Sequence, residues 1–304
     1  MNITICPADH DIYPGIAACF LETRGPNYYS AEYYDAEWLK HNCELFAALN
    51  DNGELVGAAG LARGLWDEEK TTGCLLTIPP RFAGNGIAKL LIAHFIGILK
   101  ERGAGSAKGQ VVTGHTAVQN IVEGFGWIPT GFLYGARDGK NLSPAAEGKS
   151  ALVLYAGAFS AKDAGTLYIH KDIADPARRM YECFGVKAEF RERGRHFESA
   201  LRHIYDAHNR ALYIKAAECG ADLTAALNHV RGQHPGNLSV TVSLDLGSPS
   251  AIYGYEVLRE AGYRFCGFDP LGTREYALFY RGGIPNQINL TAEAETMRCE
   301  VDAI

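Results

Sequence analysis

The run AGNGIA at residues 83–88 stands where an apolar helical pattern begins, within the segment IPPRFAGNGIAKLLIAHFIGILKERG at residues 78–103. Glycine adopts positive φ angles without steric cost, so the run predicts a tight loop that leads directly into a helix. The first amides of a helix have no intrahelical partner and carry a partial positive charge. The segment therefore predicts either a phosphate-binding loop or a simple strand-to-helix turn.

The length of the chain favours two domains. It contains 304 residues, and small residues at positions 158–165 interrupt its pattern of strands and helices. Domains usually contain about 100–200 residues. We therefore expect one domain at residues 1–160 and a second at residues 161–304.

The composition narrows the classes of partner and compartment. The net charge of −6 and the pI near 5.9 argue against nucleic acid or an anionic membrane as the main partner. The start MNITICPADHD lacks a signal-peptide pattern, and the apolar run LLIAHFIGIL is too short to span a bilayer. The eight cysteines form no CxxC pair, which indicates reduced, mostly buried thiols. We expect a soluble, cytoplasmic protein without a metal; the sequence leaves open whether it forms a homo-oligomer.

The order of the predicted elements indicates an α/β (α+β) fold with a mixed, mostly antiparallel sheet flanked by helices. Strand patterns alternate every second residue and helix patterns repeat near 3.6 residues. They predict the order β-α-α-β-β-β-α-β-α-β-β up to residue 159, with a hairpin at Asn50–Gly53 and a short helix at residues 36–41. Later helices at 221–233 and 250–262, with strands between and after them, form a weak internal repeat.

Two motifs carry a resemblance to a known family. IPPRFAGNGIAKLLIAHF and, about thirty residues later, VVTGHTAVQNIVEGFGWIPTGF resemble the signatures of the GNAT superfamily of N-acyltransferases, and the similarity covers roughly residues 3–157. Further segments resemble a group of bacterial two-part GNAT proteins whose second half is degenerate. In the second half, AECGADLTAAL offers one glycine where a cradle would lie, so we expect no coenzyme A there. A Rossmann dinucleotide site is the rival, but its loop lies within a parallel βαβ unit with an acidic residue about 20 residues on, whereas the loop here follows antiparallel hairpin strands.

The resemblance implies the residues that bind acetyl-CoA, the acyl-donor cosubstrate. It assigns the strand residues Leu76 and Ile78 to the pantetheine arm, with a backbone N–H near Ile78 polarising the thioester carbonyl. Ala83 stands where the family places a basic residue, while Arg81 begins a literal R-x-x-G-x-G match and keeps a cation nearby. The cradle for the pyrophosphate would consist of Phe82, Ala83, Gly84, Asn85, Gly86, Ile87 and Ala88.

The resemblance leaves the proton donor open. Many family members carry a tyrosine four residues before the Gly-aromatic pair, and this chain has Val122 there. His115, at the position of a family asparagine, can orient the cofactor or supply the proton; a capping or core histidine is the alternative. Tyr134 offers another hydroxyl, with a structural hydrogen bond as the alternative.

The acceptor side of the reaction has several candidates. Tyr28, Tyr29 and Tyr33 either form a wall of the acceptor site or pack over the sheet. The acids Asp67, Glu68 and Glu69 either attract an amine or form a polar turn. A covalent route through Cys74 stays possible in principle, although that residue lies in an expected core strand. We treat His196, His203 and His208, two of which would share one helical face, as part of a solvated basic surface and not as metal ligands.

These observations predict an acyl-CoA-dependent N-acetyltransferase. It would move an acetyl or small acyl group by direct attack to an amine of a small molecule or protein. The alternative is a non-catalytic, acyl-CoA-binding regulatory module, which the missing tyrosine at position 122 favours.

Overall fold

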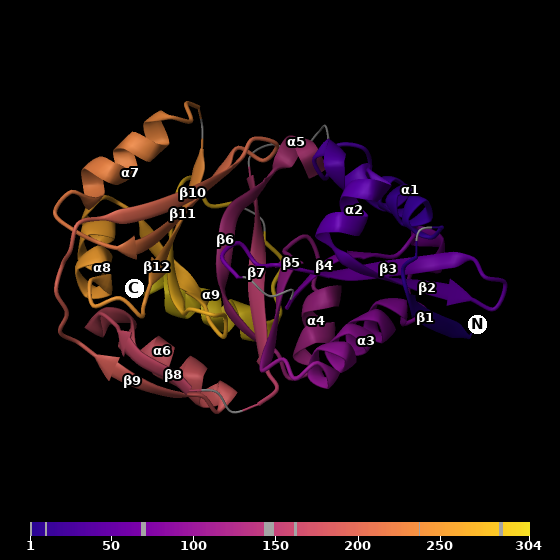
Figure 1. Ribbon diagram of the computed structural model, residues 1–304, viewed down its shortest axis with the longest axis horizontal. Helices are drawn as coiled ribbons and strands as arrows, with labels where there is room; N and C mark the ends of the chain where they lie inside the picture. The colour runs from indigo at the N-terminus through magenta and orange to yellow at the C-terminus, as the bar shows by residue number, and fades with distance from the viewer. Residues whose placement is uncertain are drawn as a thin grey trace. The chain divides into compact units, whose positions relative to one another are not determined.

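The computed structural model describes residues 2–9, 11–67, 71–142, 149–160, 163–236, 238–285 and 288–304. The chain forms two compact units (Figure 1). Unit 1 contains Met1–Gln110 and Lys140–Ala146, and unit 2 contains Val111–Gly139 and Glu147–Ile304. The domain boundary that we expect near residue 160 lies inside unit 2. That this residue separates two acyltransferase-like halves stays a prediction.

Unit 1 follows the predicted order of elements. Its strands form a sheet in the order β1-β2-β3-β4-β5, antiparallel except for the parallel pair β4 and β5. The helices α1 and α2 lie on one face of this sheet and α3 lies on the other (Figure 1). The elements are β1 Ile3–Pro7, α1 Tyr13–Arg24, η1 Ala31–Tyr34, α2 Ala36–Asn42, β2 Glu44–Asn50, β3 Leu55–Ala62, β4 Thr72–Thr77, η2 Pro80–Phe82, α3 Ile87–Glu101 and β5 Ser106–Val112, whose last residues belong to unit 2.

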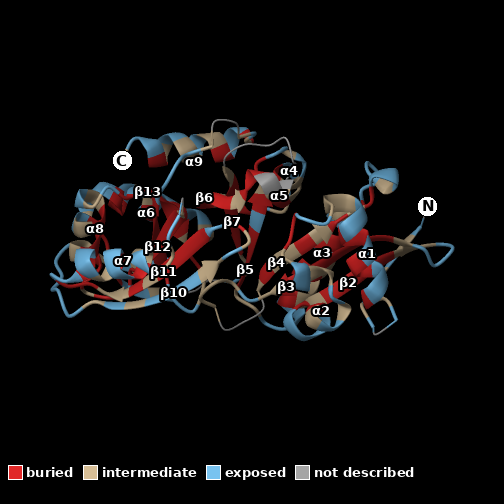
Figure 2. Cartoon of the chain, turned by 90° about the horizontal axis from the view of Figure 1, so that it is seen from above, coloured by how far each residue is buried: buried red, intermediate tan, exposed pale blue. Residues whose placement is uncertain are grey.

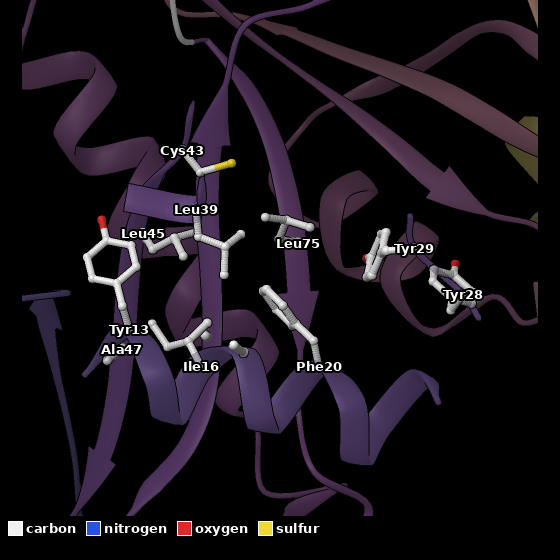
Figure 3. Close-up of a cluster of buried hydrophobic side chains, with 12 residues drawn as sticks. Tyr13, Ile16, Phe20, Tyr28, Tyr29, Leu39, Cys43, Leu45, Ala47 and Leu75 are labelled. Atoms are coloured by element: carbon white, nitrogen blue, oxygen red, sulfur yellow. The ribbon is translucent and has the colours of Figure 1, made fainter. Parts of the chain in front are cut away.

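The core of unit 1 forms between α1, α2 and the sheet. Ile16, Phe20 and Leu39 are fully buried there, and Leu75 of β4 joins them (Figure 3). Ile16 and Phe20 are four residues apart and share one face of α1, so the apolar spacing of the sequence accounts for the contact. This packing fixes the last turn of α1 against β4.

In unit 2 the strands pair in the order β7-β6-β13-β14-β12-β11-β10, antiparallel except for β11 and β12, and β8 and β9 form a separate parallel pair. Strands β6, β7 and β11 to β14 are largely buried, whereas β8, β9, β10 and the outer faces of the helices are largely exposed (Figure 2). The elements are α4 Ala117–Glu123, β6 Ile128–Asp138, β7 Lys149–Ala158, β8 Asp163–Tyr168, α6 Lys171–Phe184, β9 Lys187–Arg191, β10 Ala200–Asp206, β11 Ala211–Glu218, α7 Leu223–Gly232, β12 Ser239–Asp245, α8 Ala251–Glu260, β13 Arg264–Asp269, β14 Tyr276–Arg281 and α9 Ala292–Asp302. The short helix α5, Gly139–Leu142, lies between β6 and β7 in the sequence.

The mixed α/β fold with a mostly antiparallel sheet is confirmed, and one local expectation was wrong. His196 and His203 do not share a helical face, because His196 lies in a loop and His203 lies in the edge strand β10. The exposed charged side chains of β10 hide the alternation that identifies a strand. No helix among the described residues is long and apolar enough to cross a membrane.

Candidate functional site

The glycine loop turns tightly into α3. A short turn, Pro80–Phe82, precedes it, and Gly84 and Gly86 have φ angles of 80° and 75°. Gly86 is the N-cap of α3 in the left-handed region, which a residue with a Cβ enters at a cost of roughly 1–2 kcal/mol. A Cβ on either glycine would meet no atom within 4 Å. The backbone angle therefore requires glycine here, and the space beside the loop is open.

The backbone amides of this loop are available to an anion. Among the residues that the structure describes, the N–H groups of residues 84–89 donate to no backbone carbonyl, and the helical ladder begins with Leu90 donating to Gly86. The side chain of Asn85 folds back and donates to the carbonyl of Phe82 at 3.1 Å. Exposed amides at the positive end of a 15-residue helix fit a phosphate group.

Arg81 has partners of its own chain. Its guanidinium pairs with Glu22 and, at 3.5 Å, with Glu54, and it lies over the ring of Phe82 at 4.8 Å. Lys89, in the first turn of α3, is exposed. A cation at the N-terminal end of a helix opposes the helix dipole, so its position is unfavourable unless an anion lies nearby. Lys89 is a candidate cation that the sequence pattern did not single out.

The strand before the loop contains a distortion at Leu75. This residue has a φ of 54°, which is rare for a residue with a branched side chain, and the register of β4 against β3 shifts there. Gly60 of β3 lets the neighbouring strands lie close to it because it has no side chain. A Cβ at this position would lie 3.3 Å from Cys74 Sγ and 2.4 Å from a carbon of Leu45. Strained backbone of this kind tends to occur at functional sites, where it redirects backbone groups.

β4 also separates from its other neighbour. Its parallel pairing with β5 consists of Thr72 with Lys108 and Gly73 with Gly109, although β4 continues to Thr77. From Cys74 onward, β4 is therefore not paired with β5 in this ladder. The carbonyl of Leu76 accepts a hydrogen bond from Arg24 at 3.3 Å, and Ile78 is half-buried just after the strand.

The structure thus has a tight glycine loop with free amides, and before it a distorted strand with an open edge. One comparison with known protein families agrees with these features. Residues 10–127 match the model of the acetyltransferase (GNAT) family. The chain carries a GNAT domain. The resemblance inferred from the two motifs is thus confirmed.

Solved structures resemble the GNAT domain distantly. They include a GCN5-related N-acetyltransferase from Kribbella flavida (15% identity, 52% of this chain and 98% of the other, TM-score 0.44). The ribosomal-protein-S18-alanine N-acetyltransferase of Escherichia coli has 14% identity, covers 52% and 95%, and has a TM-score of 0.40. A phosphinothricin acetyltransferase of Sinorhizobium meliloti, solved with acetyl-CoA, has 13% identity, covers 52% and 89%, and has a TM-score of 0.42. No curated protein matches the sequence.

His115, the predicted proton donor of the GNAT domain, lies in unit 2 in the loop before α4. Its side chain is exposed. The loop is held by Gln119, which is fully buried and whose Nε2 lies within hydrogen-bond distance of the carbonyl oxygens of Val112, His115 and Asn289. The Oε1 of Gln119 accepts from the backbone of Thr291 at 3.1 Å. Residues near the C-terminus therefore fix the loop that carries His115.

Replacing Gln119 by leucine should destabilise unit 2 by about 3 kcal/mol, because the buried backbone N–H of Thr291 would lose its acceptor and the carbonyls of Val112, His115 and Asn289 would lose a donor. Urea unfolding measures this change. Asn120→Ala is the matched control, since Asn120 is exposed and bonds to Thr116 within its own helix turn. An unfolding free energy of Gln119→Leu equal to that of the control would contradict the assigned network.

Tyr134 lies in β6, also in unit 2, and is buried. Its ring stacks on Phe132 at 5.4 Å and packs against Tyr280 at 5.6 Å. Burial raises the pKa of its hydroxyl well above the usual value, with Asp302 adding to the shift. This hydroxyl is a weaker acid than that of an exposed tyrosine.

The residues around the second motif serve the packing of the GNAT domain. Val122, at the position of the family tyrosine, is buried, so no hydroxyl is present there. Gly126 has a φ of 80°, and Trp127 is buried with a side-chain carbon 2.4 Å from the position of a Cβ on Gly157. The Gly-aromatic pair thus turns the chain and seats the indole ring against a glycine of β7.

The tyrosines between α1 and α2 pack closely. Tyr28 and Tyr29 are buried, and Tyr29 stacks with Tyr33 at 5.1 Å. The hydroxyl of Tyr34 donates to the carbonyl of Gly25 at 2.6 Å and accepts from the amide of Tyr29. This bonding fixes the loop; whether its rings also contact an acceptor stays a prediction.

Other candidates of the acceptor side have local partners. Asp67 forms a buried ion pair with Lys108 at 3.0 Å, whereas Glu68 and Glu69 lie outside the described residues. Cys74 is half-buried beside the core of unit 1. Among the described residues, no group of three His, Cys, Asp or Glu side chains is placed to hold a metal ion.

In the second half of the chain, the start of helix α7 differs from the start of helix α3 in the GNAT domain. β11 and β12 pair in six consecutive positions, from Ala211 with Ser239 to Ala216 with Leu244. The start of α7 is covered by residues 197–199, since Gly220 donates to Ser199 and a Cβ on Gly220 would lie 1.8 Å from a backbone oxygen of Phe197. This start offers neither the open space nor the separated strands of the glycine loop.

Proposed function

We propose that the protein transfers an acetyl or small acyl group from acyl-CoA to an amine by direct attack. The amine nitrogen forms a bond to the thioester carbonyl carbon, the carbon–sulfur bond breaks, and the nitrogen loses a proton. The leaving thiolate takes up a proton. Acyl-CoA enters as a cosubstrate, and no covalent enzyme intermediate is required.

One observation carries this proposal: the open glycine loop at the start of α3 directly follows a strand whose edge leaves its parallel neighbour. The loop amides of residues 84–89 would bind the pyrophosphate of coenzyme A. The edge of β4 beyond Gly73 would take the pantetheine arm, which has amide groups of its own to pair with backbone. The distortion at Leu75 would redirect a backbone N–H, a natural partner for the thioester oxygen.

We propose that His115 handles the proton of the departing thiolate and that Tyr134 is structural. The ring of Tyr134 is enclosed by Phe132 and Tyr280, and its raised pKa makes it a poor acid. The imidazole of His115 is exposed, and histidine is the side chain that most often transfers protons in catalysis. We expect His115→Ala to lower kcat by about 10²-fold, and Tyr134→Phe to leave it within about twofold, in steady-state assays of thiol release. The opposite ranking of the two variants would exchange these roles.

Titration calorimetry with acetyl-CoA, followed by a thiol-release screen over amines, tests the function. Binding with turnover of any amine supports the proposal. No binding at millimolar acetyl-CoA rejects it. The expected stoichiometry is one acetyl-CoA per chain, because the start of α7 is covered; two sites would contradict the assignment of the second half.

A non-catalytic acyl-CoA-binding regulatory module is the second candidate, and the buried Val122 in place of a tyrosine favours it. Acetyl-CoA binding without thiol release across small amines and peptide lysines would support this candidate. Cytoplasmic location, a protein or small-molecule acceptor and a homo-oligomer stay predictions.

A further inference from the structure

Arg24 lies at the end of α1, and its guanidinium group reaches β4. Nη2 donates to the carbonyl of Leu76 at 3.3 Å, and the guanidinium lies over the ring of Tyr28 at 5.1 Å. Gly25 follows with a φ of 78° and turns the chain away from the helix. Arg24 therefore brings a positive charge to the strand that we assign to the acyl-CoA arm.

This charge has no counter-ion in the described part of the chain. No described carboxylate pairs with Arg24, and its Nε is buried without a hydrogen-bond partner there. Arg81 and Arg102 of the same unit, in contrast, pair with Glu22 and Glu44. An unsatisfied buried N–H costs about 1–3 kcal/mol. The unused donor and the unmatched charge point to a ligand that the chain itself does not supply.

The surroundings of Arg24 restrict the chemistry of such a ligand. Guanidinium presents a planar fork of donors that fits two oxygens of a carboxylate or phosphate-type group. Its bond to Leu76 and its contact with Tyr28 fix the plane of the fork, so little conformational entropy is lost when an oxyanion binds.

We infer that the acceptor is an amine that also carries an oxyanion, and that Arg24 binds this oxyanion. The inference rests on the proposed function, since it places the acceptor beside the acyl donor at β4. Amino acids and aminoalkylphosphonates belong to this class, and plain alkylamines do not. Arg24 determines specificity and takes no part in the proton transfers.

Matched pairs of acceptors test the inference. The probes are amino acids against their amides, and 2-aminoethylphosphonate against ethanolamine, with thiol release measured at saturating acetyl-CoA. For the wild type we expect kcat/KM to be at least about 30-fold higher for the preferred anionic probe than for its neutral counterpart. Arg24→Gln should lower the anionic value by about 30-fold and the neutral value by less than about threefold. The pair with the larger ratio identifies the carboxylate or the phosphonate as the group bound.

Two further variants separate recognition from folding. Arg24→Lys keeps the charge but loses the planar fork, so it should fall between the wild type and Arg24→Gln. Arg102→Gln removes an exposed, paired arginine of the same unit and should change neither kcat/KM value. The acetyl-CoA dissociation constant of Arg24→Gln should match that of the wild type.

The outcomes distinguish this inference from the function on which it rests. Equal use of anionic and neutral probes, or an equal loss for both in Arg24→Gln, overturns the role of Arg24 while the acetyltransferase proposal stands. Acetyl-CoA binding without turnover of any probe or plain amine removes both. A lower melting temperature of Arg24→Gln with an unchanged ratio assigns Arg24 to the structure alone.

Discussion

Gly86→Val should bind acetyl-CoA at least about 100-fold more weakly than the wild type, because two or more hydrogen bonds to charged phosphate oxygens, each worth roughly 1.5–3 kcal/mol, would be lost. The φ of Gly86 is 75°, an angle that valine adopts only with strain. The side chain would also project into the open space beside the loop. Calorimetric titration with acetyl-CoA measures the loss.

Gly97→Ala provides the matched control within the same helix. Gly97 lies inside α3, a Cβ on it would meet nothing within 4 Å, and its backbone angle needs no glycine. We expect unchanged affinity and a gain in stability of about 0.5–1 kcal/mol. If Gly86→Val folds and binds acetyl-CoA as the wild type does, the pyrophosphate lies elsewhere.

Truncation after residue 160 should yield a chain that does not fold stably. The truncation removes α9, β13 and β14, which pack against β6. Their loss would expose Phe132 and Tyr134 of β6, which are buried in unit 2. Each large side chain so exposed costs about 1.5–3 kcal/mol. Solubility and near-ultraviolet circular dichroism of the truncated chain check this. A soluble, fully active fragment would show that the second half is dispensable.

A point substitution tests the contact between β6 and β13 in the full chain. Gly267 of β13 pairs with Gly131 of β6, has a φ of 112°, and a Cβ on it would lie 2.3 Å from Gly131 Cα. Gly267→Val should therefore destabilise unit 2 by more than about 3 kcal/mol. Gly232→Ala, at the end of α7 where a Cβ meets nothing within 4 Å, should not. Thermal unfolding compares the two variants.

The sequence predicted the elements of the first 159 residues because their apolar periodicity is strong and their turns contain glycine. It missed α6, although Ile173, Ala177 and Tyr181 mark one buried face and Gly185 ends the helix with a φ of 64°. The sequence therefore carries the signal for this helix. For β10, exposed on both faces, the sequence carries little signal at all.

The candidate site was predictable only where glycine marks it. The glycines at positions 84 and 86 allow a positive φ to be predicted from the sequence. The positive φ of Leu75 could not be predicted, because it depends on how β3 and β4 pair. Arg24 resembles an ordinary arginine at a helix end, and its contact with Leu76 spans 52 residues. Such properties arise from tertiary packing and have no local signature.

The hydrogen bonds of Gln119 with Asn289 and Thr291 join positions 170 and 172 residues apart. A ribosome must therefore synthesise nearly the whole polypeptide before the loop that carries His115 is held in place. Most of unit 1 lies within the first 110 residues, which emerge much earlier during translation. Fixing of the loop that carries His115 is therefore among the last steps in the synthesis and folding of the chain.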